Sequence, residues 1–214
     1  MKALLVTDIH ANYEEAKTAH RIVNPDIILD CGDHEDIFNI FETTPHFFIK
    51  GNHEPSSISF DVGNYLNPPY PLPSGMVMRA RDGNSTFSFA GVSGNYSSRN
   101  LINAVNKRDL NALIGIPSGS LDVLLLHESP LSIDEDSASI ELAKQITEQI
   151  DRIHPRYVFA GHFGKSRTLI TPGKVAITNL EDIRRGYSIL DINGKDITFK
   201  PVSLVHYSAY NRKR

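Results

Sequence analysis

The fold is decided by the stretch Ile27-Ile28-Leu29-Asp30-Cys31-Gly32-Asp33, in which a short apolar run leads directly into a glycine-aspartate turn. An apolar run this short, without alternation, is typical of a β-strand buried on both faces. Four other runs have the same form, and each is followed by a polar or glycine-containing loop: Ala3 to Val6, Phe47 to Ile49, Val123 to Leu126, and Tyr157 to Ala160. The repeated pattern predicts parallel strands in the interior of an α/β protein.

Helical and hairpin patterns fill the intervals between these runs. Helices are predicted from Asn12 to about Val23, from about Ser98 to Leu113, and along the apolar face that ends at Ile153 before Pro155. Two antiparallel hairpins are also predicted, one from Met76 to Ala90 and one from Tyr187 to Val202 with Asn193-Gly194 as its turn. We therefore expect one mixed α/β domain over residues 1–214.

Composition excludes several classes of protein. The chain has 214 residues, of which 40% are hydrophobic, as in an ordinary globular protein. Its formal net charge of −3 argues against a long footprint on duplex nucleic acid without excluding nucleic acid altogether. One cysteine, Cys31, cannot form an internal disulfide, and no run is apolar enough for a signal peptide or a membrane span. We expect a cytoplasmic protein with no membrane partner.

Polar clusters follow all five apolar runs. Loops at the carboxyl ends of strands converge on one crevice in open α/β sheets, so these side chains are expected to meet. They are Asp8, His10, Asp33, Asn52, His127 and His162. One Asp-x-His or Gly-Asp pair alone is more often ordinary turn chemistry, but five such pieces at strand ends indicate a shared site. Carboxylate, imidazole and amide donors suit Mn, Fe or Zn better than Mg or Ca.

The ordered motifs resemble those of the calcineurin-like metallophosphoesterases. They are Asp8-Ile9-His10, Gly32-Asp33-His34-Glu35-Asp36, Gly51-Asn52-His53-Glu54, His127 and Gly161-His162, and the resemblance extends from Lys2 to about Asn193. It implies a four-layer α-β-β-α sandwich with two mixed β-sheets and a site for two divalent metal ions, with Mn preferred. By this resemblance Asp8 and His10 hold one metal, Asp33 bridges both, and Asn52, His127 and His162 hold the second.

The resemblance and the chemistry of phosphate esters together suggest a mechanism. Two cations about 3.5–4 Å apart neutralise the phosphoryl oxygens and lower the pKa of a bridging water, whose hydroxide attacks phosphorus in line. His53 resembles the family's histidine that contacts the phosphate and protonates the leaving oxygen. Glu54 or Asp36 could orient a neighbouring histidine, although a loop-anchoring role is equally compatible with the sequence. Arg99 and Asn95 are candidate substrate contacts, with an ordinary surface arginine as the alternative reading of Arg99.

Two departures from the family pattern matter. The family's usual Gly-His-x-His is Gly161-His162-Phe163-Gly164 here, so Gly164 stands where a ligand of the first metal is expected. This change predicts a weak first site, with His34 as a possible replacement ligand and Ser166 as a poorer one. The second departure is the absence of an arginine after Asp36, where Ile37 and Phe38 follow. It argues against the protein serine/threonine phosphatase branch.

Three functions remain open from the sequence. The first is hydrolysis of a phosphodiester or phosphomonoester of a small molecule or nucleotide. The second is a structure-selective nuclease acting with a partner, and the third is a non-catalytic scaffold that retains one metal. Retention of His53 favours an enzyme, because a scaffold needs no leaving-group acid, and net acidity favours a small substrate. The sequence leaves the oligomeric state open.

Overall fold

The computed structural model describes residues 1–35, 40–41, 44–54, 69–96, 103–133 and 137–204. Its first sheet has the strand order β12-β11-β1-β2-β3-β4. These strands are β1 (Lys2–Val6), β2 (Ile27–Asp30), β3 (His46–Phe48), β4 (Tyr70–Pro71), β11 (Gly186–Asn193) and β12 (Asp196–Ser203). The strands from β1 to β4 pair in parallel, whereas β11 is antiparallel to both β1 and β12.

The second sheet has the order β5-β6-β7-β8-β10-β9. These strands are β5 (Met78–Asp82), β6 (Ser85–Val92), β7 (Val123–Leu126), β8 (Tyr157–Ala160), β9 (Arg167–Ile170) and β10 (Ala176–Asn179). Pairing is parallel from β6 through β7 and β8 to β10, and antiparallel at both edges. Both sheets are therefore mixed, as the sequence predicted.

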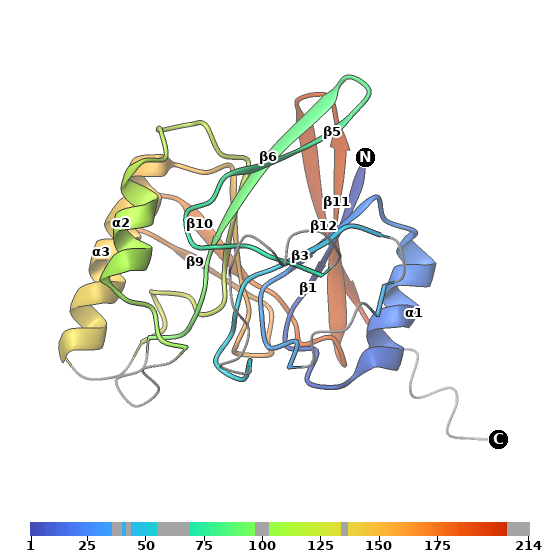
Figure 1. The fold of residues 1–214 in the computed structure, drawn as a ribbon, viewed down its shortest axis with the longest axis horizontal. Helices are drawn as coiled ribbons and strands as arrows, with labels where there is room; N and C mark the ends of the chain where they lie inside the picture. The colour runs from blue at the N-terminus through green and yellow to red at the C-terminus, as the bar shows by residue number, and fades with distance from the viewer. Residues whose placement is uncertain (36–39, 42–43, 55–68, 97–102, 134–136, 205–214) are drawn as a thin grey trace.

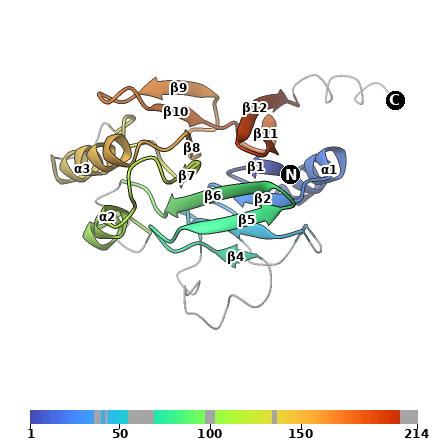
Figure 2. The ribbon, with the colours of Figure 1, turned by 90° about the horizontal axis from the view of Figure 1, so that it is seen from above.

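Helices cover the outer faces of the two sheets. Helix α1 (Tyr13–Val23) lies on one flank, while α2 (Lys107–Ile114) and α3 (Ser137–Ile153) lie on the other (Figure 1). The view from above keeps the same separation (Figure 2). This arrangement is the predicted four-layer α-β-β-α sandwich. Within the described residues, no helix is both long and apolar enough to cross a bilayer.

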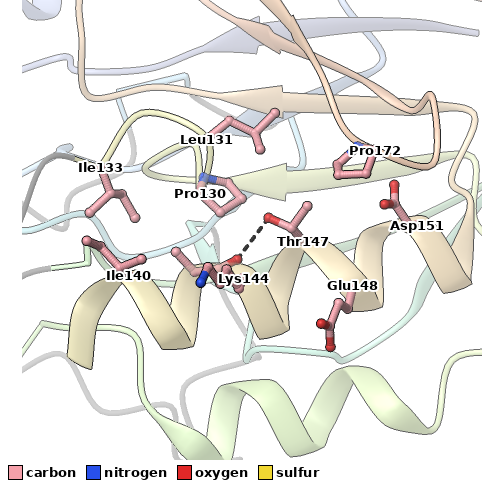
Figure 3. A pocket seen from close by; sticks show the side chains of 10 residues that line it. Pro130, Leu131, Ile133, Ile140, Lys144, Thr147, Glu148, Asp151 and Pro172 are labelled. Atoms are coloured by element: carbon pink, nitrogen blue, oxygen red, sulfur yellow. Dashed lines mark hydrogen bonds between the residues drawn. The ribbon is translucent and has the colours of Figure 1, made fainter. Parts of the chain in front are cut away.

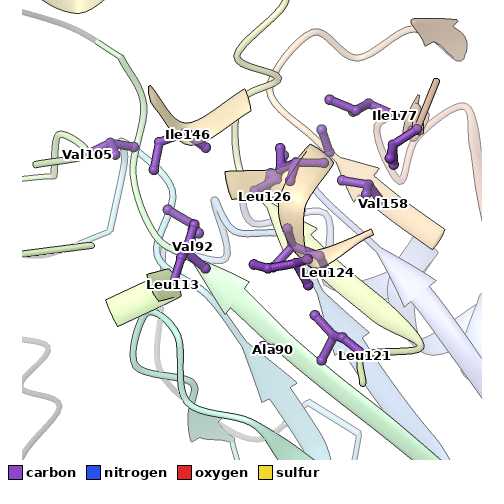
Figure 4. Packing of buried hydrophobic residues seen from close by; sticks show 14 of the residues in the cluster. Ala90, Val92, Val105, Leu113, Leu121, Leu124, Leu126, Ile146, Val158 and Ile177 are labelled. Atoms are coloured by element: carbon purple, nitrogen blue, oxygen red, sulfur yellow. The ribbon is translucent and has the colours of Figure 1, made fainter. Parts of the chain in front are cut away.

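Three hydrophobic clusters fill the spaces between the layers. Alternate residues of β2 divide between two of them: Ile28 packs towards α1, whereas Leu29 packs between the sheets against residues such as Leu125. The third cluster joins the second sheet to α2 and α3, where Leu124 and Ile146 belong to the same packed set (Figure 4). Burial on both faces explains why these strands are continuous apolar runs.

Two predicted boundaries are wrong. Helix α2 begins at Lys107, because Asn106 and Asp109 form a capping box: the Asn106 side chain accepts the Arg108 N–H at 2.8 Å, and Asp109 accepts the Asn106 N–H at 2.9 Å. Part of the longer predicted helix, residues 98–102, lies outside the described residues. In the second hairpin Asn193 pairs with Asp196, so the turn residues are Gly194 and Lys195, one position later than predicted.

Candidate metal centre

Loops at the carboxyl ends of β1, β2, β3, β7 and β8 meet at one edge of the sandwich. Backbone hydrogen bonds fasten these loops to each other. The Asp8 N–H donates to the Gly32 carbonyl at 2.9 Å, and the His10 N–H donates to the Asp33 carbonyl at 3.1 Å. In the second sheet, the Gly161 N–H donates to the His127 carbonyl at 2.8 Å. These hydrogen bonds hold the loops that carry the predicted polar residues close to one another.

Asp33 lies at the centre of this edge. Its Oδ2 atom is 3.5 Å from His10 Nε2 and 3.5 Å from His127 Nε2. It belongs to two groups whose donor atoms lie within 4.8 Å of one another, one with Asp8 and His10 and one with His127 and His162. One carboxylate shared by two sets of donors is the arrangement that two neighbouring cations require.

Glycine allows the loops to approach this closely. A Cβ atom added to Gly51 would overlap Asp33 Oδ1 and lie 2.7 Å from His127 Cε1. A Cβ atom on Gly161 would likewise overlap the Thr7 hydroxyl. Both positions therefore need glycine for a steric reason that motif spacing alone does not reveal.

His127 is fixed in one orientation by its surroundings. Its ring is fully buried, and Nδ1 lies 2.9 Å from the Cys31 carbonyl oxygen, which can only accept a hydrogen bond. The proton must therefore be on Nδ1, and the Nε2 atom faces Asn52 Oδ1 at 2.9 Å and Asp33 Oδ2 at 3.5 Å. When Nε2 carries no proton, three electron-rich atoms converge there, and a cation is the partner that satisfies all of them.

Several residues of the edge have strained backbones. Asp8, His10, Asp33 and His162 have φ angles of +51°, +42°, +60° and +71°, in the left-handed region that ordinary residues avoid. Each such residue costs on the order of 1 kcal/mol or more, and clusters of them are typical of functional sites. The strained backbone at His162 directs its N–H towards Asp8, and this N–H donates to Asp8 Oδ2 at 2.9 Å.

Glu35 is a site residue that sequence reasoning did not assign. Its Oε1 atom lies 2.7 Å from His10 Nδ1, which turns His10 Nε2 towards Asp8 and Asp33. The contact with Asp8, together with Glu35 and Asp33, raises the pKa of His10 to about 9. A proton therefore occupies His10 when no metal competes for it. Glu35 lies within the motif from Gly32 to Asp36, and this position in the sequence could have indicated that it belongs to the site.

His53 and Glu54 occupy opposite sides of their loop. The exposed His53 ring lies edge-to-face with the His10 ring, with centroids 5.0 Å apart, while its N–H donates to Asp33 Oδ1 at 2.9 Å. Glu54 is buried and accepts the N–H groups of His34 at 2.7 Å and Gly51 at 2.5 Å. Burial and then the Asp33 charge raise the pKa of Glu54 to about 7. Its contacts fit the loop-anchoring alternative.

Four predicted residues remain: His34 and Asn95, which the structure describes, and Asp36 and Arg99, which it does not. The His34 imidazole points into the core, where Nδ1 is 3.4 Å from Asp30 Oδ2, and it is not among the donors around Asp8 and His10. Asn95 lies beside the loop that carries Asn52: its N–H donates to the Asn103 carbonyl at 3.1 Å, and the Asn103 side chain donates to the Asn52 carbonyl at 3.2 Å. The two other candidates, Asp36 and Arg99, lie outside the described residues.

Charged side chains surround Gly164, the position where the family pattern places a histidine. Gly164 has a φ of +60°, and a Cβ atom there would lie 3.5 Å from Asp182 Cβ. Asp182 is itself occupied, because it accepts the Arg184 Nε at 2.9 Å on each carboxylate oxygen. The Arg185 side chain also donates to the Gly164 carbonyl at 3.2 Å. An ion pair and a second arginine therefore lie beside Gly164.

An apolar pocket of about 380 Å³ lies elsewhere, between α3 and the segments that follow β7 and β9 (Figure 3). Leu131, Ile133 and Ile140 contribute much of its lining, and Pro172 closes one side. None of the residues at the strand-end edge lines it. The pocket is therefore separate from the polar residues at the strand ends.

The geometry agrees with a comparison of the sequence with known families. A family model described as calcineurin-like phosphoesterase matches residues 1–166. The chain belongs to this family. It is therefore a metallophosphoesterase, a hydrolase that acts on phosphoric ester bonds, in a family that binds divalent metal ions. None of the curated proteins compared with this metallophosphoesterase matches it significantly.

Solved structures show the same fold at low sequence identity. A dimetal phosphatase from Danio rerio has a TM-score of 0.61 and 11% identity, covering 94% of this chain and 95% of its own. The calcineurin-like phosphoesterase YfkN from Bacillus subtilis has a TM-score of 0.52 and 12% identity, covering 97% and 91%. GAP50, the anchor in the inner membrane complex of Plasmodium, has a TM-score of 0.58 and 10% identity, covering 95% and 84%.

Proposed function

We propose that this metallophosphoesterase hydrolyses a phosphodiester or phosphomonoester of a small molecule or nucleotide at a dinuclear metal centre. The observation that carries the proposal is the position of Asp33, whose Oδ2 lies 3.5 Å from an imidazole nitrogen on each side. Asp33 would bridge two cations, Asp8 and His10 would complete the first site, and Asn52, His127 and His162 the second. The mixture of nitrogen and oxygen donors favours Mn, with Fe or Zn as alternatives.

The charges of the donor side chains, as well as the distances between them, are suitable for binding divalent cations. Asp8 and Asp33 are almost fully buried, at 4% and 1% exposure, and two carboxylates this close need a positive partner. Burial, followed by the neighbouring His127, lowers the pKa of His162, so its imidazole is neutral and free to act as a ligand. When bound, two cations would neutralise the phosphoryl oxygens and lower the pKa of a water molecule, so that hydroxide is available to attack phosphorus.

The protein's own residues have separate tasks in this proposal. The His127 Nδ1 bond to the Cys31 carbonyl and the His10 Nδ1 contact with Glu35 keep both Nε2 atoms aimed at Asp33. His53 is exposed beside His10, so it can reach the oxygen of a substrate at the open edge and donate a proton to it. The hydrogen bond from its backbone N–H to Asp33 Oδ1 ties the loop that carries His53 to the carboxylate that would bridge the two cations.

Net charge and the Gly164 substitution bear on the alternatives. A formal charge of −3 supports a small substrate over a long nucleic acid. A nuclease that acts together with a partner protein is therefore the second candidate. Gly164 provides no side chain to the first site and favours the non-catalytic scaffold as the third. GAP50, an anchor by its name, has the same fold, so the fold alone does not decide between an enzyme and a scaffold.

The test is a substrate screen of the Mn²⁺-loaded protein. Aryl phosphodiesters and aryl phosphomonoesters are assayed first, then nucleotides, and then single-stranded and structured oligonucleotides. Turnover of a small ester that is lost on chelation and restored by Mn²⁺ supports the proposal. Turnover confined to oligonucleotides supports the nuclease. No turnover of any substrate, with only one Mn²⁺ bound per chain, supports the scaffold.

A further inference from the structure

Three ionisable side chains lie buried behind the candidate metal centre, on the α1 side of the first sheet. Asp30 and His46 are 0% exposed, and His34 is 3% exposed. The strand register explains why they meet. His46 is paired with Ile28, and Ile28 and Asp30 point to the same face of β2 because side chains alternate along a strand. The turn after β2 then returns His34 to that face.

The three side chains converge on one oxygen atom. Asp30 Oδ2 lies 3.4 Å from His34 Nδ1 and 3.2 Å from His46 Nε2, and the three donor atoms lie within 4.8 Å of one another. The other carboxylate oxygen is already used, since Asp30 Oδ1 accepts the Gly32 N–H at 2.9 Å. Charge-assisted hydrogen bonds are normally about 2.7–2.9 Å long. Donor atoms about 2.0–2.1 Å from a tetrahedral zinc ion lie roughly 3.3–3.4 Å apart, which matches the observed separations better.

Burial also favours a bound cation. Asp30 is 0% exposed, and a carboxylate enclosed in a hydrophobic core needs a positive partner within contact distance.

We propose that Asp30, His34 and His46 bind a structural zinc ion, separate from the candidate metal centre at the strand ends. Two imidazole nitrogens and one carboxylate oxygen are a common set of zinc ligands. A water molecule would supply the fourth ligand of a tetrahedral ion. Because all three ligands are buried, the ion enters during folding and contributes stability to the folded chain.

The position of the ion gives it a defined effect on the neighbouring site. It joins the end of β2 to the start of β3, and the loops after these strands carry Asp33 and Asn52. The His34 backbone extends this connection, because its N–H donates to Glu54, which also accepts the Gly51 N–H. The buried ion would hold both loops at a fixed separation without touching substrate.

The test separates the buried site from the strand-end centre by substitution. A His10→Gln/His127→Gln chain lacks one histidine donor at each of the two strand-end sites, which weakens both, and it is produced with Zn²⁺ in the medium. After mild chelation we expect one Zn²⁺ per chain by elemental analysis. Adding His46→Gln should remove that ion and lower the melting temperature by roughly 5–10 °C. His20→Gln is the matched control, because His20 lies on α1 beside Phe41 and outside the cluster, and zinc content should not change.

A second measurement keeps the test decisive if the His46 variant does not fold. The His10→Gln/His127→Gln chain is unfolded with chelator and refolded with Co²⁺, whose visible spectrum reports four-coordinate binding. One equivalent of tetrahedral Co²⁺ supports the site. A chain that holds no Zn²⁺ and gives no tetrahedral Co²⁺ spectrum overturns the proposal, and a proton shared among the three side chains then accounts for the cluster.

Discussion

Asp33→Asn is the substitution that tests the shared-ligand geometry most directly. Asparagine tolerates the φ of +60° at this position, and its Oδ1 can still accept the His53 N–H that Asp33 accepts at 2.9 Å. The shape and this hydrogen bond are therefore kept, whereas the negative charge between His10 and His127 is lost. An alanine would add backbone strain and an unpaired N–H, so its effect would be harder to interpret.

We expect a large loss of activity with little change in the metal-free fold. An amide oxygen is a much weaker metal ligand than a carboxylate, and Asp33 would serve two cations, so kcat/KM should fall by about 10³-fold or more, or roughly 4 kcal/mol. In the metal-free protein two effects oppose each other. Repulsion between the Asp33 and Glu54 carboxylates is relieved, and attraction to His10 is lost. The net change in the free energy of unfolding should stay within about 1 kcal/mol, or roughly 2–4 °C in melting temperature.

The assay compares parent and variant in activity and in thermal unfolding, each with chelator and with graded Mn²⁺. The parent should gain stability as Mn²⁺ rises, and the variant should gain much less. Asp122→Asn is the matched control, since Asp122 accepts the Ser88 N–H at 2.8 Å just before β7, at the opposite end of that strand from His127. It should lower stability without lowering kcat/KM. Asp33→Asn activity within tenfold of the parent, or an equal gain from Mn²⁺, would refute the shared-ligand reasoning.

Three other predictions concern single residues of the site. Gly164→His should increase the Mn²⁺ affinity of the weaker site at least tenfold relative to Gly164→Ala. The alanine variant is the control, because it has the same backbone strain at a φ of +60° but no donor atom. Equal affinities of the two variants by calorimetry would count against a missing ligand. His53→Ala should leave metal content unchanged and slow alkyl esters more than activated aryl esters, because only a poor leaving group needs the proton; equal slowing would assign His53 another role. The pKa of His10 in the metal-free protein is raised to about 9, so metal binding at pH 7 should release a proton. The apparent metal affinity should therefore increase with pH up to about 9 and then level off. Calorimetry in buffers of different ionisation enthalpy measures the released proton, and an affinity that does not change with pH would contradict the prediction.

Sequence patterns were sufficient for the parts of the fold that depend on local periodicity. The apolar runs predicted buried parallel strands because a strand covered on both faces has no position where a polar residue is favourable. Helix α3 followed from its apolar face and from Pro155. The start of α2 was missed because the capping box at Asn106 competes with a continuous helical pattern upstream. The turn of the last hairpin shifted by one residue because pairing across the strands sets its register.

The sequence by itself determined which donors could meet, because residues that follow parallel strands must emerge at the same edge. It could not determine which partner each side chain faces. Glu35 beside His10, and His34 turned towards Asp30 and His46 instead of the first site, depend on side-chain direction after a turn with positive φ angles. The Asp182–Arg184 pair lies within one loop, but its position beside Gly164 depends on the approach of two segments about eighteen residues apart. Such contacts depend on how the loops pack in space, and neither composition nor periodicity encodes that packing.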